Sequence, residues 1–140
     1  MKKLKTWILF VTFAFLFVGC ASTHFTKESS FNQPSNLTDI TISVKENSIT
    51  DTGLVLLIKN NTSNEYSYDM SYYIEQKRND EWFAEKDDRV FNALAAILKP
   101  NATDEFHVTW EKKLPKGTYR VIKPVVAQTA GVTSVEFTVD

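Results

Sequence analysis

Leu114-Pro115-Lys116-Gly117-Thr118-Tyr119 is the stretch that decides the fold of this chain. Pro and Gly in close succession indicate a tight turn, because Pro fixes its own φ and Gly tolerates conformations that other residues avoid. Tyr119 and Val121 then alternate with polar residues, which is typical of a half-buried strand. The stretch therefore leads through a turn into a strand that begins with a tyrosine.

Strand-like alternation continues on both sides of this turn, from Asp39 to the end of the chain. Residues 91–98 could form a single helical turn or a strand, and we expect a short, irregular strand because Pro100 ends the segment and the surrounding pattern is β. Residues 66–74 form one long strand or two strands joined by a bend. About seven strands without a long helix predict an all-β domain, either a sandwich of two antiparallel sheets or a closed barrel. The other expected strands cover residues 40–44, 54–58, 106–110, 119–125 and 135–139.

Residues 114–119 resemble the tyrosine corner of immunoglobulin-type sandwiches, in which the phenol hydroxyl bonds back to the chain. The order of motifs over residues 40–139 also resembles the bacterial Ig-like domains found on small lipoproteins of Gram-positive type. The resemblance implies an immunoglobulin-like antiparallel β-sandwich of about seven strands and a surface location, and it assigns no chemistry. Those motifs are the Gly53-Leu54 strand, the Asn60-Asn61-Thr62 turn, the tyrosine-rich strand, the Asn79-Asp80-Glu81-Trp82 hairpin, Leu98-Lys99-Pro100-Asn101, the Trp110 strand and Lys123.

The first twenty residues have the organisation of an export signal. Residues 1–5 read MKKLK, and residues 7–18 are apolar except for Thr12, a run shorter than the roughly 20 residues that span a bilayer. The following Gly19-Cys20 resembles the lipobox of bacterial lipoproteins, with Phe17 where that family prefers Leu. The resemblance implies a diacylglycerol on Cys20 and cleavage before it. Two alternatives are ordinary signal-peptidase cleavage, which would release a soluble protein, and an uncleaved anchor.

We therefore divide the chain into a lipoprotein signal peptide (1–19), a lipidated flexible tether (20–37) and an Ig-like domain (38–140). The tether is rich in Ser, Thr and Asn and has no apolar period. Phe25 and Phe31 could instead dock on the domain, and the isolated His24 is expected in solvent. Cys20, the only cysteine, has no partner for a disulfide.

Charge and residue types argue against several classes of function. Loss of Lys2, Lys3 and Lys5 with the signal would leave 13 basic against 17 acidic residues, a poor balance for binding nucleic acid. His107 lies mid-strand without a triad, and the chain lacks the ligands of a zinc site. We therefore predict no catalytic residue, no cofactor and no metal.

Adjacent acidic residues form three pairs that we expect to be solvated charges, because neighbours on a strand point to opposite faces. A weak calcium site near Asp87 and Asp88 is the alternative that stays open. The other two pairs are Asp80-Glu81 and Asp104-Glu105.

Aromatic residues are the best indication of a binding surface, since 10 Phe, 5 Tyr and 3 Trp exceed what a small core needs. We expect most to pack in the core and choose Tyr73 and Phe83 as candidate partner-binding residues, because each is out of phase with core-facing neighbours. The sequence thus predicts a non-enzymatic binding or accessory lipoprotein on the extracytoplasmic face of the cell membrane, with a protein partner at the cell envelope. The alternative is an inhibitor or immunity-type lipoprotein that blocks an enzyme at the membrane surface, using the charged loop 85–89.

Overall fold

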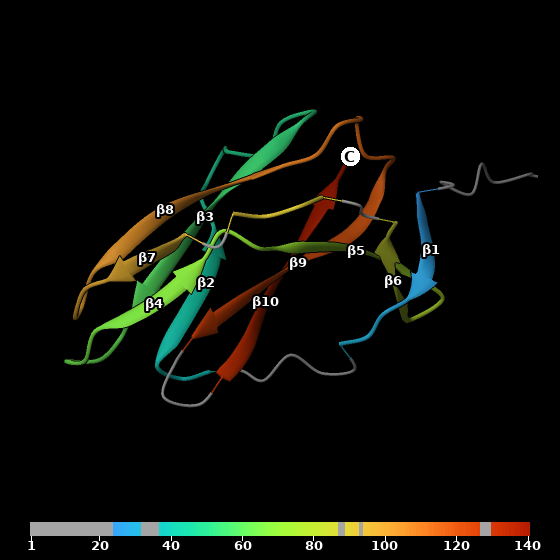
Figure 1. Cartoon of the computed structure of the whole chain (residues 1–140). Coiled ribbons are helices and arrows are strands. Elements are labelled where there is room, and N and C mark those ends of the chain that lie inside the picture. The colour runs from blue at the N-terminus through green and yellow to red at the C-terminus, as the bar shows by residue number, and fades with distance from the viewer. Residues whose placement is uncertain (1–23, 32–36, 87–88, 93, 127–129) are drawn as a thin grey trace, which may run out of the picture.

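The computed structural model describes residues 24–31, 37–86, 89–92, 94–126 and 130–140, and every regular element in them is a β-strand (Figure 1). All strand pairings are antiparallel, as predicted for an all-β domain. The strands are β1 (Phe25–Glu28), β2 (Ile40–Val44), β3 (Gly53–Asn60), β4 (Tyr66–Asp69), β5 (Tyr73–Arg78), β6 (Glu81–Glu85), β7 (Ala95–Leu98), β8 (Thr103–Thr109), β9 (Gly117–Val126) and β10 (Ala130–Val139).

These strands form two sheets. The larger has the order β1-β6-β5-β9-β4-β7, with β10 paired to β9 as well, and the smaller has the order β2-β3-β8. β9 is the centre of the larger sheet, because β10 runs along one side of it while β5 and β4 share the other. The predicted immunoglobulin-like antiparallel sandwich is confirmed. The number of strands exceeds the expected seven because the tyrosine-rich segment forms both β4 and β5, and because β1 comes from the predicted tether.

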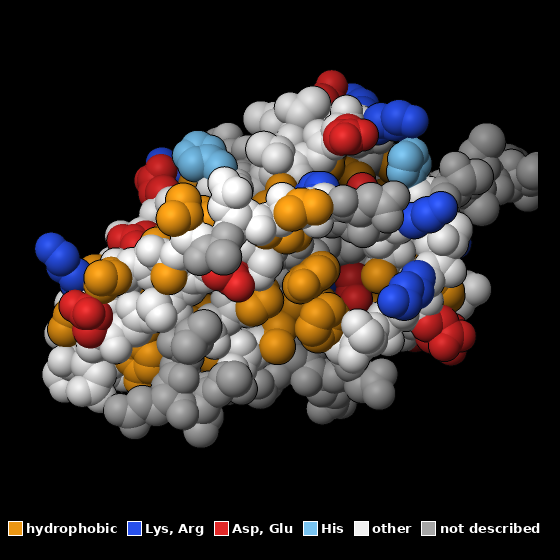
Figure 2. All heavy atoms as spheres, in the orientation of Figure 1, with side chains coloured by type: hydrophobic (Ala, Val, Ile, Leu, Met, Phe, Trp, Pro, Cys, Tyr) orange, Lys and Arg blue, Asp and Glu red, His pale blue; other side chains and the backbone are white. Residues whose placement is uncertain are grey.

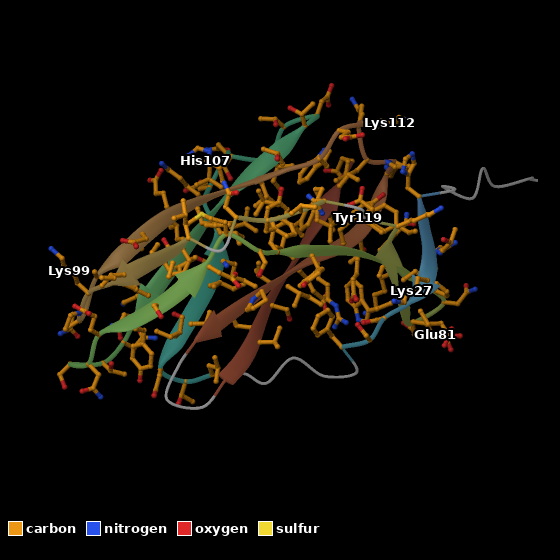
Figure 3. All side chains as sticks on the ribbon, viewed as in Figure 1. Lys27, Glu81, Lys99, His107, Lys112 and Tyr119 are labelled. Carbon is orange, nitrogen blue, oxygen red and sulfur yellow. The ribbon has the colours of Figure 1, made fainter. Side chains whose placement is uncertain are left out.

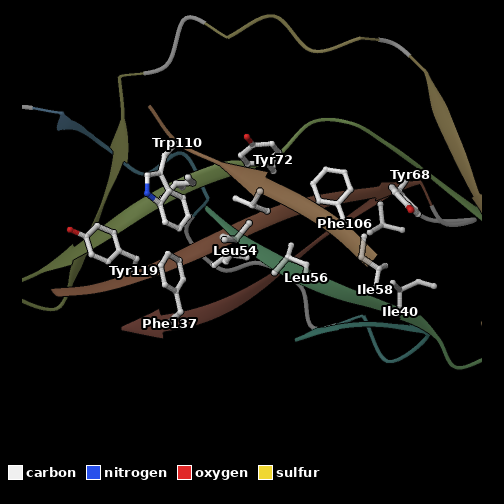
Figure 4. Packing of buried hydrophobic residues seen from close by; sticks show 14 of the residues in the cluster. Ile40, Leu54, Leu56, Ile58, Tyr68, Tyr72, Phe106, Trp110, Tyr119 and Phe137 are labelled. Carbon is white, nitrogen blue, oxygen red and sulfur yellow. The ribbon is translucent and has the colours of Figure 1, made fainter. Parts of the chain in front are cut away.

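The core lies between the two sheets and consists of alternate inward-facing residues (Figure 4). An aromatic stack closes one end of it. The ring of Phe137 lies 5.9 Å from Trp110, at an interplanar angle of 12°, and 5.6 Å from Tyr119. Such offset stacks contribute beyond their buried area, so these rings join β10 to β9 and to the end of β8. Fully buried members of the core include Ile40, Leu56, Ile58, Ile74, Leu98, Val108 and Val121.

The tyrosine corner forms as the sequence indicates. The Tyr119 hydroxyl donates a hydrogen bond of 2.6 Å to the Pro115 carbonyl and accepts one of 3.2 Å from Gln76 Nε2. Burial raises the pKa of the Tyr119 phenol, and the Gln76 hydrogen bond opposes this effect. The corner therefore fixes the connection through which the chain leaves the smaller sheet after β8 and enters the larger sheet at β9.

The predicted flexible tether is wrong for residues 25–28, which form β1 at the edge of the larger sheet. β1 pairs with β6, and Phe25 is fully buried with its ring 5.6 Å from Tyr119. The docking of Phe25, which the sequence left as an alternative, is therefore what the structure contains. Only one of the four β1 residues is buried, so the strand has no apolar alternation that could reveal it. Cys20 and the predicted signal peptide lie outside the described residues.

A bend between β4 and β5 interrupts the tyrosine-rich segment and is filled by Lys123 from β9. The Lys123 ammonium donates hydrogen bonds to the carbonyls of Asp69, at 2.6 Å, and Ser71, at 2.8 Å. It also lies 4.6 Å from the centre of the Phe106 ring in the smaller sheet. Lys123 is fully buried, so it satisfies carbonyls that the bend removes from strand pairing.

Lys123 gives the stability of the fold a specific pH dependence. Burial disfavours the charged ammonium and lowers its pKa from 10.5 to about 8, while Asp69 opposes the shift. Between these values the unfolded chain holds a proton that the folded chain has lost, so the free energy of unfolding rises with pH. We expect a rise of about 2 kcal/mol between pH 8 and pH 10. Above pH 10 the opposite effect of Tyr68, whose pKa is raised to about 12 by burial and by Asp104, sets in.

Urea unfolding at a series of pH values from 7.5 to 10 measures this rise. Lys123→Met, which keeps the length of the side chain and removes the titrating group, should give a nearly flat profile. A Lys123→Met profile that rises in parallel with the unmodified protein would refute this assignment.

Candidate binding surface

Tyr73, one of the two predicted partner-binding residues, lies at the start of β5 and remains 38% exposed. Its neighbour Ile74 points into the core, so Tyr73 projects from the outer face of the larger sheet. The ring of Phe31 lies 5.4 Å from the Tyr73 ring. Together with Phe91 they line a hollow of about 550 Å³, which we call the Tyr73 hollow. The hollow is also lined by Lys27, Lys86, Arg89, Glu75 and Glu85.

Beneath this hollow, a buried ion pair holds the covering segment in place. Glu75 and Arg120 are partners in the β5–β9 register, and Arg120 Nη2 lies 2.5 Å from Glu75 Oε2. The same guanidinium donates to the Phe31 carbonyl at 2.9 Å and to Ser29 Oγ at 3.2 Å. The hydrogen bond from Arg120 to the Phe31 carbonyl therefore holds the Phe31 ring against Tyr73.

Three apolar side chains on the connection from β6 into β7 are exposed. Val90 is 96% exposed, Leu94 68% and Ile97 59%. Figure 2 shows hydrophobic side chains gathered near the middle of the face that this connection crosses in Figure 1. We use the name apolar face for the exposed apolar residues of β5 and of this connection, namely Tyr73, Val90, Leu94 and Ile97. Exposed apolar surface of this kind is typical of sites at which proteins meet partners.

The connection itself is fastened to the sandwich by the residues that alternate with the exposed ones. The Phe91 ring lies 5.3 Å from Tyr72, and the Arg89 guanidinium lies 4.6 Å from the same ring. Arg89 Nη1 also donates to the Thr109 carbonyl at 3.0 Å. The described part of this connection is therefore held across the opening between the two sheets, with Val90 facing outward.

Phe83 does not face outward as predicted. It lies opposite Gln76 in the β5–β6 register, on the side of the sheet that faces the core, and it is half-buried against that core. The Arg78 guanidinium lies 4.1 Å from the centre of its ring. Trp82 takes the outer position instead, 4.4 Å from the Arg120 guanidinium. Contact of Phe83 with a partner stays a prediction, and the apolar face is built without it.

Polar groups in the described residues do not assemble into a metal site, because no three His, Cys, Asp or Glu residues there come together. Asp104 and Glu105 diverge as expected: Asp104 accepts a hydrogen bond from Tyr68, and Glu105 pairs with Lys45 at the surface. His107 is exposed on β8. Asp87 and Asp88, the alternative calcium site, lie outside the described residues.

Comparison with known families agrees with this geometry. The profile of a family described as the bacterial Ig-like domain matches residues 36–138. The chain belongs to the bacterial Ig-like domain family. In this Ig-like domain, β1 and Phe31 precede the matched region, and the apolar face lies within it. A search of curated proteins found no significant match.

In the part of the chain that the structure describes, no helix has the length and apolar character needed to cross a membrane.

The sequence predicted the exposure of Tyr73 but gave no indication that Val90, Leu94 and Ile97 are exposed. The segment FNALAAIL was expected as a short, irregular strand, and β7 does form at its end. A run of apolar residues without regular alternation does not indicate which of them face solvent. The one signal in the sequence was that this apolar run lacks the regular polar positions of an ordinary surface strand.

Proposed function

We propose that this Ig-like domain is a non-enzymatic binding module, held on the extracytoplasmic face of a bacterial cell membrane by lipid on Cys20. Its partner is a protein of the cell envelope that covers the apolar face. Membership of the bacterial Ig-like domain family supports a surface or accessory role. The apolar signal ending in Gly19-Cys20 supports the lipid anchor.

The exposure of Val90, Leu94 and Ile97, together with that of Tyr73, is the observation that carries the binding role. An apolar centre with charged residues at its edge is the usual composition of a protein interface. Here Lys27 and Lys86 are exposed and line the Tyr73 hollow. A protein partner with an apolar centre and acidic residues around it would complement this surface.

The alternative, an inhibitor that inserts the charged loop 85–89 into an enzyme, has less support. Arg89 and Glu85, at the two ends of that loop, lie 3.4 Å apart and are half-buried. Arg89 also binds the Thr109 carbonyl, so its side chain lies along the domain. The described part of the loop is thus fastened to the sandwich, which favours the apolar face as the binding surface.

Site-specific photo-crosslinking in cells tests this proposal. A photoreactive residue at Tyr73 or at Ile97 should capture the same envelope protein, because both positions belong to the apolar face. The same residue at His107, which is exposed on the smaller sheet, is the matched control and should capture little. Ile97→Lys should reduce the capture from position 73 at least fivefold. The binding role is wrong if positions 73 and 97 capture nothing, or only what position 107 captures.

A further inference from the structure

We propose that β1 orients the domain on its membrane, so that the end of the sandwich next to His24 meets the phospholipid headgroups. The opposite end, around Lys99, then points away from the bilayer. Figure 3 shows Lys27 and Lys112 near β1 and Lys99 at the far end of the molecule. The inference rests on the lipid anchor of the proposed function and adds to it a docked surface with a lipid partner.

The small number of residues between the anchor and the domain limits which part of the domain can reach the membrane. Only four peptide units join Cys20 to His24, and a chain of four residues spans at most about 14 Å. A flexible tether extending to residue 37 would reach about 60 Å on the same basis. A folded unit of about 100 residues has a radius of gyration of about 13 Å. The short connection therefore cannot bring the far end of the domain to the membrane.

The reach of the connection stays this short only if β1 remains attached to the domain. Several contacts hold β1 in place. The Lys86 amide donates to the His24 carbonyl at 2.8 Å, and the Ser29 amide donates to the Trp82 carbonyl at 2.9 Å. The Arg78 guanidinium binds the Phe25 carbonyl. With the Phe25 side chain fully buried as well, the strand is fixed at both ends.

The surface next to His24 suits an anionic lipid headgroup. A hollow of about 590 Å³ lies between His24, the residues Glu85, Lys86 and Arg89, and residues 110–115. Lys86 and Lys112 line it, are exposed, and have no carboxylate partner among the described residues. Glu85 and Glu111 line the hollow too and offset part of this positive charge, so the short connection sets the orientation and the lysines only add to it. Lysines near a membrane surface are attracted to anionic lipids.

Fluorescence quenching on vesicles tests the orientation in the full lipidated chain. Because the Cys20 thiol carries the lipid, a new cysteine is the only free thiol for a dye. Glu111→Cys marks the end next to His24, and Lys99→Cys marks the far end. In vesicles of phosphatidylcholine and phosphatidylglycerol containing a headgroup nitroxide lipid, we expect quenching at 111 to exceed that at 99 at least threefold.

Two further variants make the result specific. A flexible insertion of twenty Gly and Ser residues between Ser22 and Thr23 should remove most of the difference, because the domain can then rotate. Lys86→Gln with Lys112→Gln should reduce quenching at 111 in vesicles with phosphatidylglycerol, and less in vesicles of phosphatidylcholine alone. Equal quenching at 111 and 99 in the chain with its own connection overturns the inference. If the chain does not sediment with vesicles, the lipid anchor is wrong and the orientation with it.

Discussion

Arg120→Met should lower the free energy of unfolding of this domain by about 3–5 kcal/mol, because it leaves a buried carboxylate without its cation. Glu75 is fully buried and Arg120 almost so. Arg120 Nε and Nη2 both contact Glu75 Oε2, and within the described residues Glu75 Oε1 has no hydrogen-bond partner. The variant would also remove the hydrogen bonds to Ser29 and to the carbonyl of Phe31, whose ring packs on Tyr73.

Two controls separate this effect from the loss of any charge. Glu75→Leu combined with Arg120→Met removes both charges, so it should be less destabilised than Arg120→Met alone. Lys45→Met breaks the exposed Lys45–Glu105 pair, which should cost less than about 1 kcal/mol. Urea unfolding of all three variants gives the comparison. A loss in Arg120→Met no greater than in Lys45→Met would show that the buried pair contributes little.

The larger part of the fold could be predicted from the sequence because it depends on local patterns. In β8, Phe106 and Val108 are buried while His107 is exposed, as the alternation requires. The turn at residues 114–117 followed by Tyr119 predicted the corner, and its hydroxyl does bond back to Pro115. Such features need only a strand, a turn and the side chains next to them.

The candidate site was harder to predict because it depends on segments far apart in the chain. Glu75 and Arg120 alternate with core residues and are expected in solvent, but residues 29–31 cover them. β6 carries Trp82 and Phe83 side by side, and the sequence cannot decide which of two adjacent aromatic residues faces the core. The register with β5 decides it in favour of Phe83. The alternation of residues within one strand predicts neither the covering by residues 29–31 nor the register between β5 and β6.

Cys20→Ser should have the largest effect on where the protein is found. Without the thiol no diacylglycerol can be attached, and the variant should either remain an uncleaved precursor or be released from the membrane. A single acyl chain binds a membrane only weakly and reversibly, whereas two or more chains hold a protein firmly. The loss of membrane-held mature protein should therefore be nearly complete. Ser22→Ala, two residues further along, is the matched control and should leave retention unchanged.

Fractionation of cells that express the Cys20→Ser variant tests the lipid anchor most directly, provided that the size of the protein is read in each fraction. We predict that mature-sized protein disappears from the membrane fraction and that labelled palmitate no longer enters the chain, while Ser22→Ala behaves as the unmodified protein. Processed Cys20→Ser protein that stays in the membrane fraction in unchanged amount would contradict the account.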